Sequence, residues 1–165
     1  MAMVTPEKFE KPEPVKATEA LRRPAAFRVS LTMMRQVIDH LASALPDEGC
    51  GLLAVPAAGD GASEAVKFYP GTNADRSPAR YTMEPAEVLA AFKEMRSQEW
   101  QLGAVVHSHP DSEARPSPTD LKEANYPDAL MLIVSFAVPT PEARAWSVSG
   151  EGSEQQVVEC ALVIG

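Results

Sequence analysis

Apolar side chains recur at helical spacing in two segments of the chain. The first segment predicts a helix over about residues 31–44, with Ser30 as its N-terminal cap and Pro46 as its stop. The second predicts a helix that begins at Pro85, because proline suits a first helical position, and ends before Trp100. The apolar residues that share a face are Leu31, Met34, Ile38 and Leu41 in the first helix, and Val88, Leu89, Phe92 and Met95 in the second.

Between and after these helices, short apolar runs bounded by glycine, proline and polar residues predict strands. One more helix, a short one, is predicted over Pro118–Ala124. Because strands outnumber helices and do not strictly alternate with them, the pattern favours a single α+β layered domain. The predicted strands span Gly51–Val55, Glu64–Tyr69, Ala79–Met83, Leu102–His107, Ala129–Phe136, Arg144–Val148 and Gln155–Val163.

The N-terminal segment differs in composition from the rest of the chain. Its first 24 residues include four prolines and nine charged side chains, with few periodic apolar residues. Such a segment buries too little apolar surface to offset its ordering entropy, so we expect a flexible tail over residues 1–26. The whole chain is 45% hydrophobic and 23% charged, which is typical of a globular protein, and we expect one domain over residues 27–165.

Acidic side chains outnumber basic ones by 23 to 15, which gives a formal net charge of −8. This is the wrong sign for binding a phosphate backbone, so nucleic acid is not an expected partner. No apolar stretch approaches the roughly 20 residues of a membrane span, and residues 1–20 are too charged for a signal peptide. We therefore expect a cytoplasmic protein with no membrane contact, whose two cysteines, Cys50 and Cys160, are reduced.

Two of the three histidines lie in one short sequence, His107-Ser108-His109-Pro110. Residues two apart on an extended strand point to the same face, so both imidazoles would meet at the end of the predicted strand. A proline-containing loop then leads to a helix start, where Asp120 can face the same point. Two imidazoles and one carboxylate make a three-ligand zinc site whose fourth position stays open for water.

Each part of this pattern also has a simpler interpretation. An isolated His-x-His is more often a pair of partly exposed strand residues than a metal site. Ser117 and Asp120 fit a capping box around Pro118, although a cap and a catalytic site can coincide. Glu48, at the start of a predicted buried strand, is a candidate general base if burial raises its pKa, or else a surface acid beside Asp47.

Taken together, these residues resemble the signature of the JAMM (MPN-plus) zinc metalloproteases. The signature joins Glu48, the His107-x-His109-Pro110 motif and Ser117-x-x-Asp120, with seven residues between His109 and Ser117. The likeness runs from about residue 28 to residue 163 and is strongest to the bacterial and archaeal single-domain branch. Neighbouring features that match this branch are Cys50-Gly51-Leu52-Leu53, the segment from Asn73 to Pro78, Tyr81-Thr82-Met83-Glu84-Pro85, and Tyr126 to Leu130 leading into Ile133-Val134-Ser135.

The resemblance implies an MPN/JAB fold, similar to that of cytidine deaminases, with a mostly antiparallel central sheet flanked by helices. It implies one zinc ion per chain, held by His107, His109 and Asp120. It also implies that Glu48 takes a proton from a zinc-bound water and passes it to the leaving amine, while Ser117 supports the tetrahedral oxyanion. The expected reaction is hydrolysis of the peptide or isopeptide bond after the C-terminal Gly-Gly of a ubiquitin-like β-grasp sulfur carrier, which releases cysteine or trims a C-terminal extension.

Two other functions fit the same residues. One is isopeptidase activity on lysine-linked conjugates of a ubiquitin-like protein. The other is a noncatalytic module that binds such a partner, in which the histidines are structural. A zinc deaminase does not fit, because its signature has Glu directly after the His and adds a Pro-Cys-x-x-Cys pair, whereas this chain has Ser108 and two isolated cysteines. The sequence leaves the oligomeric state open.

Overall fold

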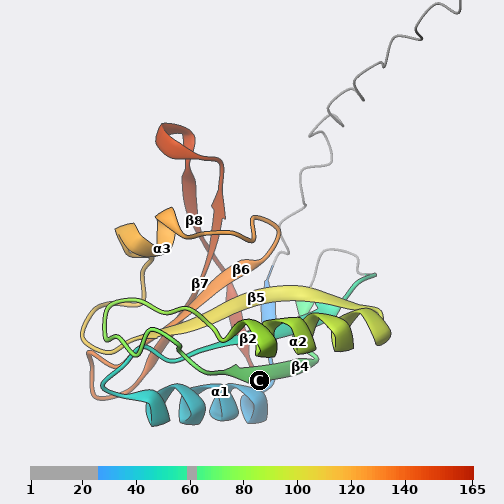
Figure 1. The fold of residues 1–165 in the computed structure, drawn as a ribbon, viewed down its shortest axis with the longest axis horizontal. Coiled ribbons are helices and arrows are strands. Elements are labelled where there is room, and N and C mark those ends of the chain that lie inside the picture. Colours follow the sequence, from blue (N-terminus) through green and yellow to red (C-terminus); the bar gives the residue numbers. More distant parts are fainter. Residues whose placement is uncertain (1–25, 59–62) are drawn as a thin grey trace, which may run out of the picture.

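The computed structural model describes residues 26–58 and 63–165, so the predicted tail over residues 1–26 lies almost wholly outside the described residues. The described part holds two β-sheets and three α-helices (Figure 1). The helices are α1 (Leu31–Ala44), α2 (Pro85–Ser97) and α3 (Pro118–Lys122), with one 3-10 helix at Gly152–Glu154. The strands are β1 (Phe27–Val29), β2 (Cys50–Pro56), β3 (Ser63–Glu64), β4 (Lys67–Gly71), β5 (Trp100–His109), β6 (Leu130–Ser135), β7 (Glu142–Ser149), β8 (Gln156–Cys160) and β9 (Leu162–Ile164).

The larger sheet has six strands in the order β4-β2-β5-β6-β7-β8. Its neighbouring strands are antiparallel except for β5 and β6, which run parallel. A smaller sheet, in the order β3-β1-β9, is parallel throughout. The predicted α+β fold with a mostly antiparallel central sheet flanked by helices is therefore confirmed.

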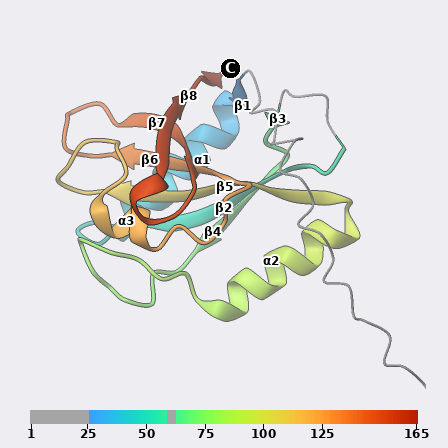
Figure 2. The same cartoon turned by 90° about the horizontal axis from the view of Figure 1, so that it is seen from above.

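The two longer helices cover opposite faces of the larger sheet (Figure 2). Alternate residues of β2 separate accordingly. Leu53 packs in the core cluster that contains Leu41 of α1, whereas Leu52 packs in the cluster that contains Met95 of α2. A third, smaller cluster forms around Trp146 of β7. Because helices and loops cover both faces, the central strand β6 is buried along its whole length and reads as a continuous apolar run.

The first helix follows its sequence signals. Ser30 caps its N-terminus by accepting a hydrogen bond from the backbone N–H of Met33 at 3.1 Å. Met34 and Leu41 of the predicted apolar face are buried, whereas Leu31 at the helix start is 48% exposed. No helix in the described ranges has the length and apolar character needed to span a membrane.

The predicted strand over Ala79–Met83 is wrong. Only Met83 makes a single β-bridge there, with Asn73, and the rest of the segment is irregular. Its backbone bonds instead to the side chain of Asn73, which accepts from the N–H of Thr82 and donates to the carbonyl of Arg80. A side chain takes the place of a neighbouring strand, which the apolar pattern does not signal.

Two other predicted strands divide where the chain passes from one sheet to the other. The predicted strand over Glu64–Tyr69 becomes the end of β3 and most of β4, and Gln155–Val163 becomes β8 and β9. In both cases the two halves belong to different sheets. The sequence does not show where the chain leaves one sheet for the other, because both halves of each run contain the same strand-forming residue types. The three-residue strand β1 was not predicted, since it is too short to show a period.

Gly49 lies where α1 passes close to the start of β2. A Cβ added at this glycine would lie 2.9 Å from Cδ2 of Leu41 and 3.0 Å from its Cα. The Gly49 N–H donates to Oγ of Ser108 at 2.8 Å, and the Gly49 carbonyl accepts from the Ser108 N–H at 3.0 Å. The close approach of helix and strand therefore requires glycine at this position.

Replacement of Gly49 by alanine is expected to lower the free energy of unfolding by about 1–3 kcal/mol, because the added methyl group overpacks a site bounded by backbone. The matched control is Gly165→Ala, where an added Cβ would meet no atom within 4 Å. Urea denaturation measures both variants. Equal stability of Gly49→Ala and the parent protein would mean that α1 can move aside at no cost.

Candidate metal centre and active site

The end of β5 brings two histidines to one face of the larger sheet. His107 and His109 are both buried, and their Nε2 atoms lie 3.2 Å apart. Ser108, between them, points to the opposite face, where its Oγ accepts from the N–H of Gly49. Strand alternation thus gives the paired imidazoles that the sequence predicts.

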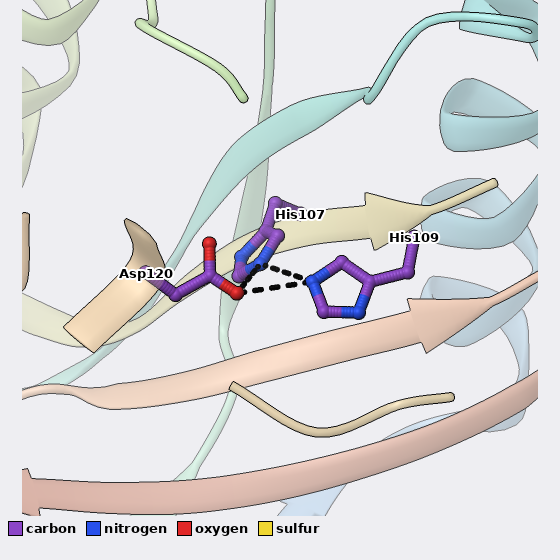
Figure 3. A group of neighbouring side chains, drawn as sticks. All are labelled: His107, His109 and Asp120. Atoms are coloured by element: carbon purple, nitrogen blue, oxygen red, sulfur yellow. Dashed lines mark hydrogen bonds and ion pairs between the residues drawn. The ribbon is translucent and has the colours of Figure 1, made fainter. Parts of the chain in front are cut away.

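Asp120 completes a cluster of three possible ligand atoms (Figure 3). Its Oδ2 lies 3.1 Å from Nε2 of His107 and 3.0 Å from Nε2 of His109. All three residues are buried, and their side chains converge from the end of β5 and from α3. The structure therefore brings together the three residues that the sequence proposes as metal ligands.

A capping box at the start of α3 holds Asp120. Oγ of the N-cap residue Ser117 accepts from the Asp120 N–H at 3.1 Å, and Oδ2 of Asp120 accepts from the Ser117 N–H at 2.9 Å. Pro118 takes the first helical position. The same carboxylate oxygen thus closes the helix cap and faces the histidines. The capping box that the sequence predicts is therefore compatible with Asp120 as a possible metal ligand.

The loop between β5 and α3 is fixed through its backbone carbonyls. Nδ1 of His109 lies 2.7 Å from the carbonyl oxygen of Glu113. Because a carbonyl can only accept, His109 donates a hydrogen bond from Nδ1, and Nε2 is the ring nitrogen that faces the cluster. The carbonyl of Ser112 accepts from Oγ of Ser135 at 2.5 Å, and the carbonyl of Ala114 accepts from Nε1 of Trp146 at 2.8 Å.

The chemistry and spacing of the three ligand atoms fit a zinc ion. Ligands about 2.0–2.1 Å from zinc in a tetrahedron lie about 3.3 Å from one another. The three atoms here are 3.0–3.2 Å apart. Two neutral imidazoles and one carboxylate are also a donor set of catalytic zinc sites. The cluster of His107, His109 and Asp120 could therefore hold a metal ion.

Burial and hydrogen bonding set the protonation states of the cluster. Burial lowers the pKa of His107, which keeps its imidazole neutral. Burial alone would raise the pKa of Asp120, but hydrogen bonds from the two imidazoles and from the Ser117 N–H outweigh it and hold that pKa well below its usual range. Burial alone would lower the pKa of His109, but its hydrogen bonds to Asp120 and to the Glu113 carbonyl raise it. A neutral imidazole and an ionised carboxylate are the forms that bind a metal.

Glu48 lies beside this cluster. The register of β2 and β5 sets Cys50 opposite His107, so Glu48 comes level with His109. Glu48 is 4% exposed, and its Oε2 has no hydrogen-bond partner among the described residues. Burial, followed by the charge of Asp120, raises the pKa of Glu48 from 4.5 to about 7. A carboxyl group with this pKa can accept and release protons near neutral pH.

The sequence matches the family described as prokaryotic homologs of the JAB domain over residues 30–149. The chain belongs to this family. The resemblance to the JAMM-type metalloproteases of bacteria and archaea is thereby confirmed. The match covers the region from the cap of α1 to the end of β7.

Three curated relatives of this JAB domain carry names that describe peptidases or conjugate cleavage. The chain is 35% identical over 127 residues to the CysO-cysteine peptidase of Mycobacterium tuberculosis, a match that covers 76% of this chain and 85% of that protein. It is 35% identical over 95 residues to a probable TtuB-protein conjugate cleaving protease of Thermus thermophilus, covering 57% and 60% respectively. It is 29% identical over 119 residues to the desampylase of Haloferax volcanii, covering 71% and 79%. These names support a peptidase function in general.

Solved structures share the fold of this JAB domain. The solution structure of a protein from Desulfitobacterium hafniense matches with a TM-score of 0.73 and 34% sequence identity, covering 84% of this chain and 92% of that chain. The solution structure of a protein from Salinibacter ruber matches with a TM-score of 0.60 and 30% identity, covering 82% and 90%.

Tyr81 also contacts the cluster of ligand atoms. The sequence identified this residue only as part of a segment that resembles the family and indicated no role for it in the site. Tyr81 lies in the loop over residues 72–84, between β4 and α2, and its ring stacks on the imidazole of His107 with centroids 4.8 Å apart and planes at 24°. Nδ1 of His107 has no hydrogen-bond partner among the described residues, so this ring is oriented by stacking and packing, whereas His109 is oriented by a hydrogen bond to the Glu113 carbonyl. An aromatic residue within a polar loop is the signal that the sequence offers.

A cavity of about 420 Å³ adjoins the cluster of ligand atoms in this JAB domain. Asp120 and Tyr81 form part of its wall, together with apolar side chains such as Leu52, Val88 and Met131 from β2, α2 and β6. Its size lies within the usual range of binding pockets. The site therefore has room for an extended segment of polypeptide beside the three ligand atoms.

Removal of the Tyr81 ring is expected to weaken metal binding by about 10–100-fold, because the imidazole of His107 then loses the contact that orients it. Tyr81→Ala should show this loss, and Tyr81→Phe, which keeps the ring, should not. Competition with a chromogenic chelator measures the affinity. Tyr126→Ala, which removes an exposed ring that contacts Phe92 instead, is the control. Equal metal affinity of the Tyr81→Ala and parent proteins would refute this role.

Replacement of Glu48 by glutamine is expected to stabilise the metal-free protein at pH 8 but not at pH 4. The carboxyl has a pKa near 4.5 when unfolded and about 7 when folded, so it opposes folding increasingly from pH 4.5 to 7 and fully above that. The amide carries no charge to bury, and the gain at pH 8 should be of the order of 1–3 kcal/mol.

Urea denaturation of chelator-treated protein at the two pH values measures this difference. Asp47→Asn, which removes the neighbouring carboxyl, is the matched control. A gain for Glu48→Gln that is equal at pH 4 and pH 8 would mean that ionisation of this carboxyl is not its origin.

Proposed function

We propose that this JAB domain is a zinc-dependent peptidase that hydrolyses the bond after the C-terminal Gly-Gly of a ubiquitin-like sulfur-carrier protein. The observation that carries this proposal is the convergence of two imidazole nitrogens and one carboxylate oxygen within 3.2 Å, beside the buried Glu48. Residues 27–165 act as the catalytic domain, and the reaction takes place in the cytoplasm.

His107, His109 and Asp120 hold the zinc ion, one per chain, in this proposal. A zinc ion in such a ligand set supplies Lewis-acid chemistry: it polarises a carbonyl group and makes water acidic enough to attack near neutral pH. The donor set of two imidazoles and one carboxylate supports zinc as the ion. A low pKa at Asp120 and a neutral His107 leave these two ligands in the forms that bind a metal, whereas His109, whose pKa is raised, gives up a proton when the metal binds.

Glu48 acts first as a base and then as an acid. Since its pKa is about 7, its ionised form is available at neutral pH to take a proton from the attacking water. The protonated form then gives this proton to the leaving amine, so that the carboxylate is restored at the end of the reaction. The burial of Oε2 without a partner among the described residues supports this role, because no neighbouring group competes for that oxygen.

Ser117 donates a hydrogen bond to the oxyanion that forms at the scissile carbonyl. Its Oγ accepts from the Asp120 N–H, so the hydroxyl hydrogen remains to be donated to another oxygen. The helix cap keeps this hydroxyl next to the carboxylate that faces the histidines. A donor aimed at developing negative charge contributes roughly 3 kcal/mol to catalysis in comparable sites.

The cavity beside the cluster supports the C-terminal end of a protein as the substrate. Its largely apolar wall and its contact with Asp120 suit an extended segment whose last bond reaches the ligand atoms. The Mycobacterium tuberculosis relative is named a CysO-cysteine peptidase. A substrate that carries cysteine agrees with release of cysteine from a Gly-Gly end. We therefore infer that this chain removes cysteine or a short extension from its carrier.

A second candidate is cleavage of isopeptide bonds between a ubiquitin-like protein and lysine side chains. The names of the Thermus thermophilus and Haloferax volcanii relatives favour it, since one of them describes cleavage of a protein conjugate and the other a desampylase. Both candidates use the same zinc ligands, base and oxyanion donor, and they differ only in the amine that leaves.

Cleavage of a carrier protein extended past Gly-Gly by one cysteine tests the proposal. Intact-mass analysis should show loss of the extension with the zinc-loaded protein and no loss after chelator treatment. Glu48→Gln should retain zinc and lower kcat by about 10²–10⁴-fold, and Ser117→Ala should lower it by about 10²–10³-fold. Asp47→Asn and Ser112→Ala, which change a neighbouring acid and another serine of the β5–α3 loop, are the matched controls.

The same samples are assayed with a lysine-linked conjugate of the carrier. Cleavage of the conjugate alone would transfer the function to the isopeptidase candidate. Zinc binding without cleavage of either substrate would favour a noncatalytic module that binds a ubiquitin-like partner. Absence of zinc binding together with absence of cleavage would refute the proposal that this chain is an enzyme.

A further inference from the structure

Asn73, at the start of the loop between β4 and α2, uses its side-chain amide for four hydrogen bonds. Nδ2 donates to the carbonyls of Glu48 and Arg80, each at 3.0 Å. Oδ1 accepts from the N–H groups of Asp75 at 3.0 Å and Thr82 at 3.2 Å. An asparagine amide has two donor hydrogens and two acceptor lone pairs, so its whole hydrogen-bonding capacity is engaged.

One of these bonds reaches the residue proposed as the base. The carbonyl of Glu48 accepts from Asn73, and the N–H of Glu48 donates to the carbonyl of Ser77 at 2.8 Å. The peptide groups on both sides of the Glu48 Cα are therefore held by the same loop. Since Oε2 of Glu48 has no partner among the described residues, the direction of this carboxyl depends on its backbone and on packing.

Two other bonds of the same amide hold the residues on either side of Tyr81. The carbonyl of Arg80 and the N–H of Thr82 both bond to Asn73, so the backbone that carries the Tyr81 ring is fixed from both sides. That ring stacks on the imidazole of His107 at a centroid distance of 4.8 Å. The amide is thus linked to a proposed zinc ligand as well as to the proposed base.

We propose that Asn73 is a positioning residue that sets both the carboxyl of Glu48 and, through Tyr81, the imidazole of His107. This inference rests on the proposed function, because it assigns importance to the base and to a zinc ligand. It adds that one amide of the loop over residues 72–84 bonds both to the backbone of the proposed base and to the backbone on either side of Tyr81.

A simple turn-forming role would explain only part of this arrangement. The bond from the Asp75 N–H to Oδ1 is an Asx turn, which asparagine and aspartate form equally well. The two bonds donated by Nδ2 reach 25 residues back and 7 residues forward along the chain, and they require an amide. Asparagine and aspartate therefore differ at the two bonds that the proposal uses.

The decisive variant is Asn73→Asp. It has the same shape and keeps the oxygen that accepts from Asp75 and Thr82, but it sets a carboxylate oxygen against the carbonyls of Glu48 and Arg80. Ser77→Ala is the matched control. It removes the bond that Oγ accepts from the Ala79 N–H in the same loop and leaves the backbone bond to Glu48 intact.

Three quantities are measured on each protein: metal affinity by chelator competition, the visible absorption of the Co²⁺-substituted protein, and kcat and KM for the extended carrier. Asn73→Asp should lower metal affinity about tenfold, alter the Co²⁺ absorption, and reduce kcat about 10–100-fold while KM changes less than about threefold. Ser77→Ala should match the parent protein in all three. If Asn73→Asp does not fold, judged by near-ultraviolet circular dichroism, Asn73→Ser carries the test with the same expectations.

An Asn73 variant that matches Ser77→Ala in metal affinity, Co²⁺ absorption and kcat would overturn the inference, even if its melting temperature is lowered. Failure of the parent protein to cleave the carrier is a different result, because it refutes the proposed substrate. In that case the metal affinity and the Co²⁺ absorption, which need no substrate, still decide whether Asn73 positions the cluster.

Discussion

The antiparallel pairing of β2 with β5 is the constraint on which the whole site depends. The two bonds between Gly49 and Ser108 continue this pairing beyond β2 and bring Glu48 level with His109. A shift of one residue in the register would change which side chains share a face and would separate the carboxyl from the imidazoles. Because α1 packs against the same glycine, the helix that covers the core also maintains the register of the site.

The site gathers groups that are unfavourable to bury. Glu48, two histidines and Asp120 are buried together at the end of β5, next to apolar clusters on both faces of the larger sheet. Capping at α3 and the Glu113 carbonyl provide hydrogen bonds for Asp120 and His109, but one oxygen of Glu48 finds no partner in the part of the chain that the structure describes. The raised pKa of Glu48 expresses this cost, and the close-packed core that surrounds the site offsets it.

Sequence patterns predicted most of the elements and, through one short motif, the cluster of three possible ligands. Alternation on β5 and the cap at Ser117 were enough, because both act over a few residues. The roles of Asn73 and Tyr81 could not be predicted, since they depend on contacts between segments far apart in the chain. The false strand over Ala79–Met83 has the same origin: an amide side chain replaces a neighbouring strand there.

Three consecutive carbonyls of the β5–α3 loop, those of Ser112, Glu113 and Ala114, accept hydrogen bonds from Ser135, His109 and Trp146 respectively. The side chains of Ser112 and Glu113 are themselves exposed and take no part in these bonds. The loop is therefore held at these three points through backbone carbonyls, and the buried side chain of Ala114 packs beside Trp146. Substitutions at Ser112 and Glu113 leave the three anchors in place, whereas an inserted or deleted residue would break their order. During divergence, or in grafting this site onto another sheet, the exposed positions Ser112 and Glu113 can vary, whereas the length of the loop and the buried Ala114 are constrained.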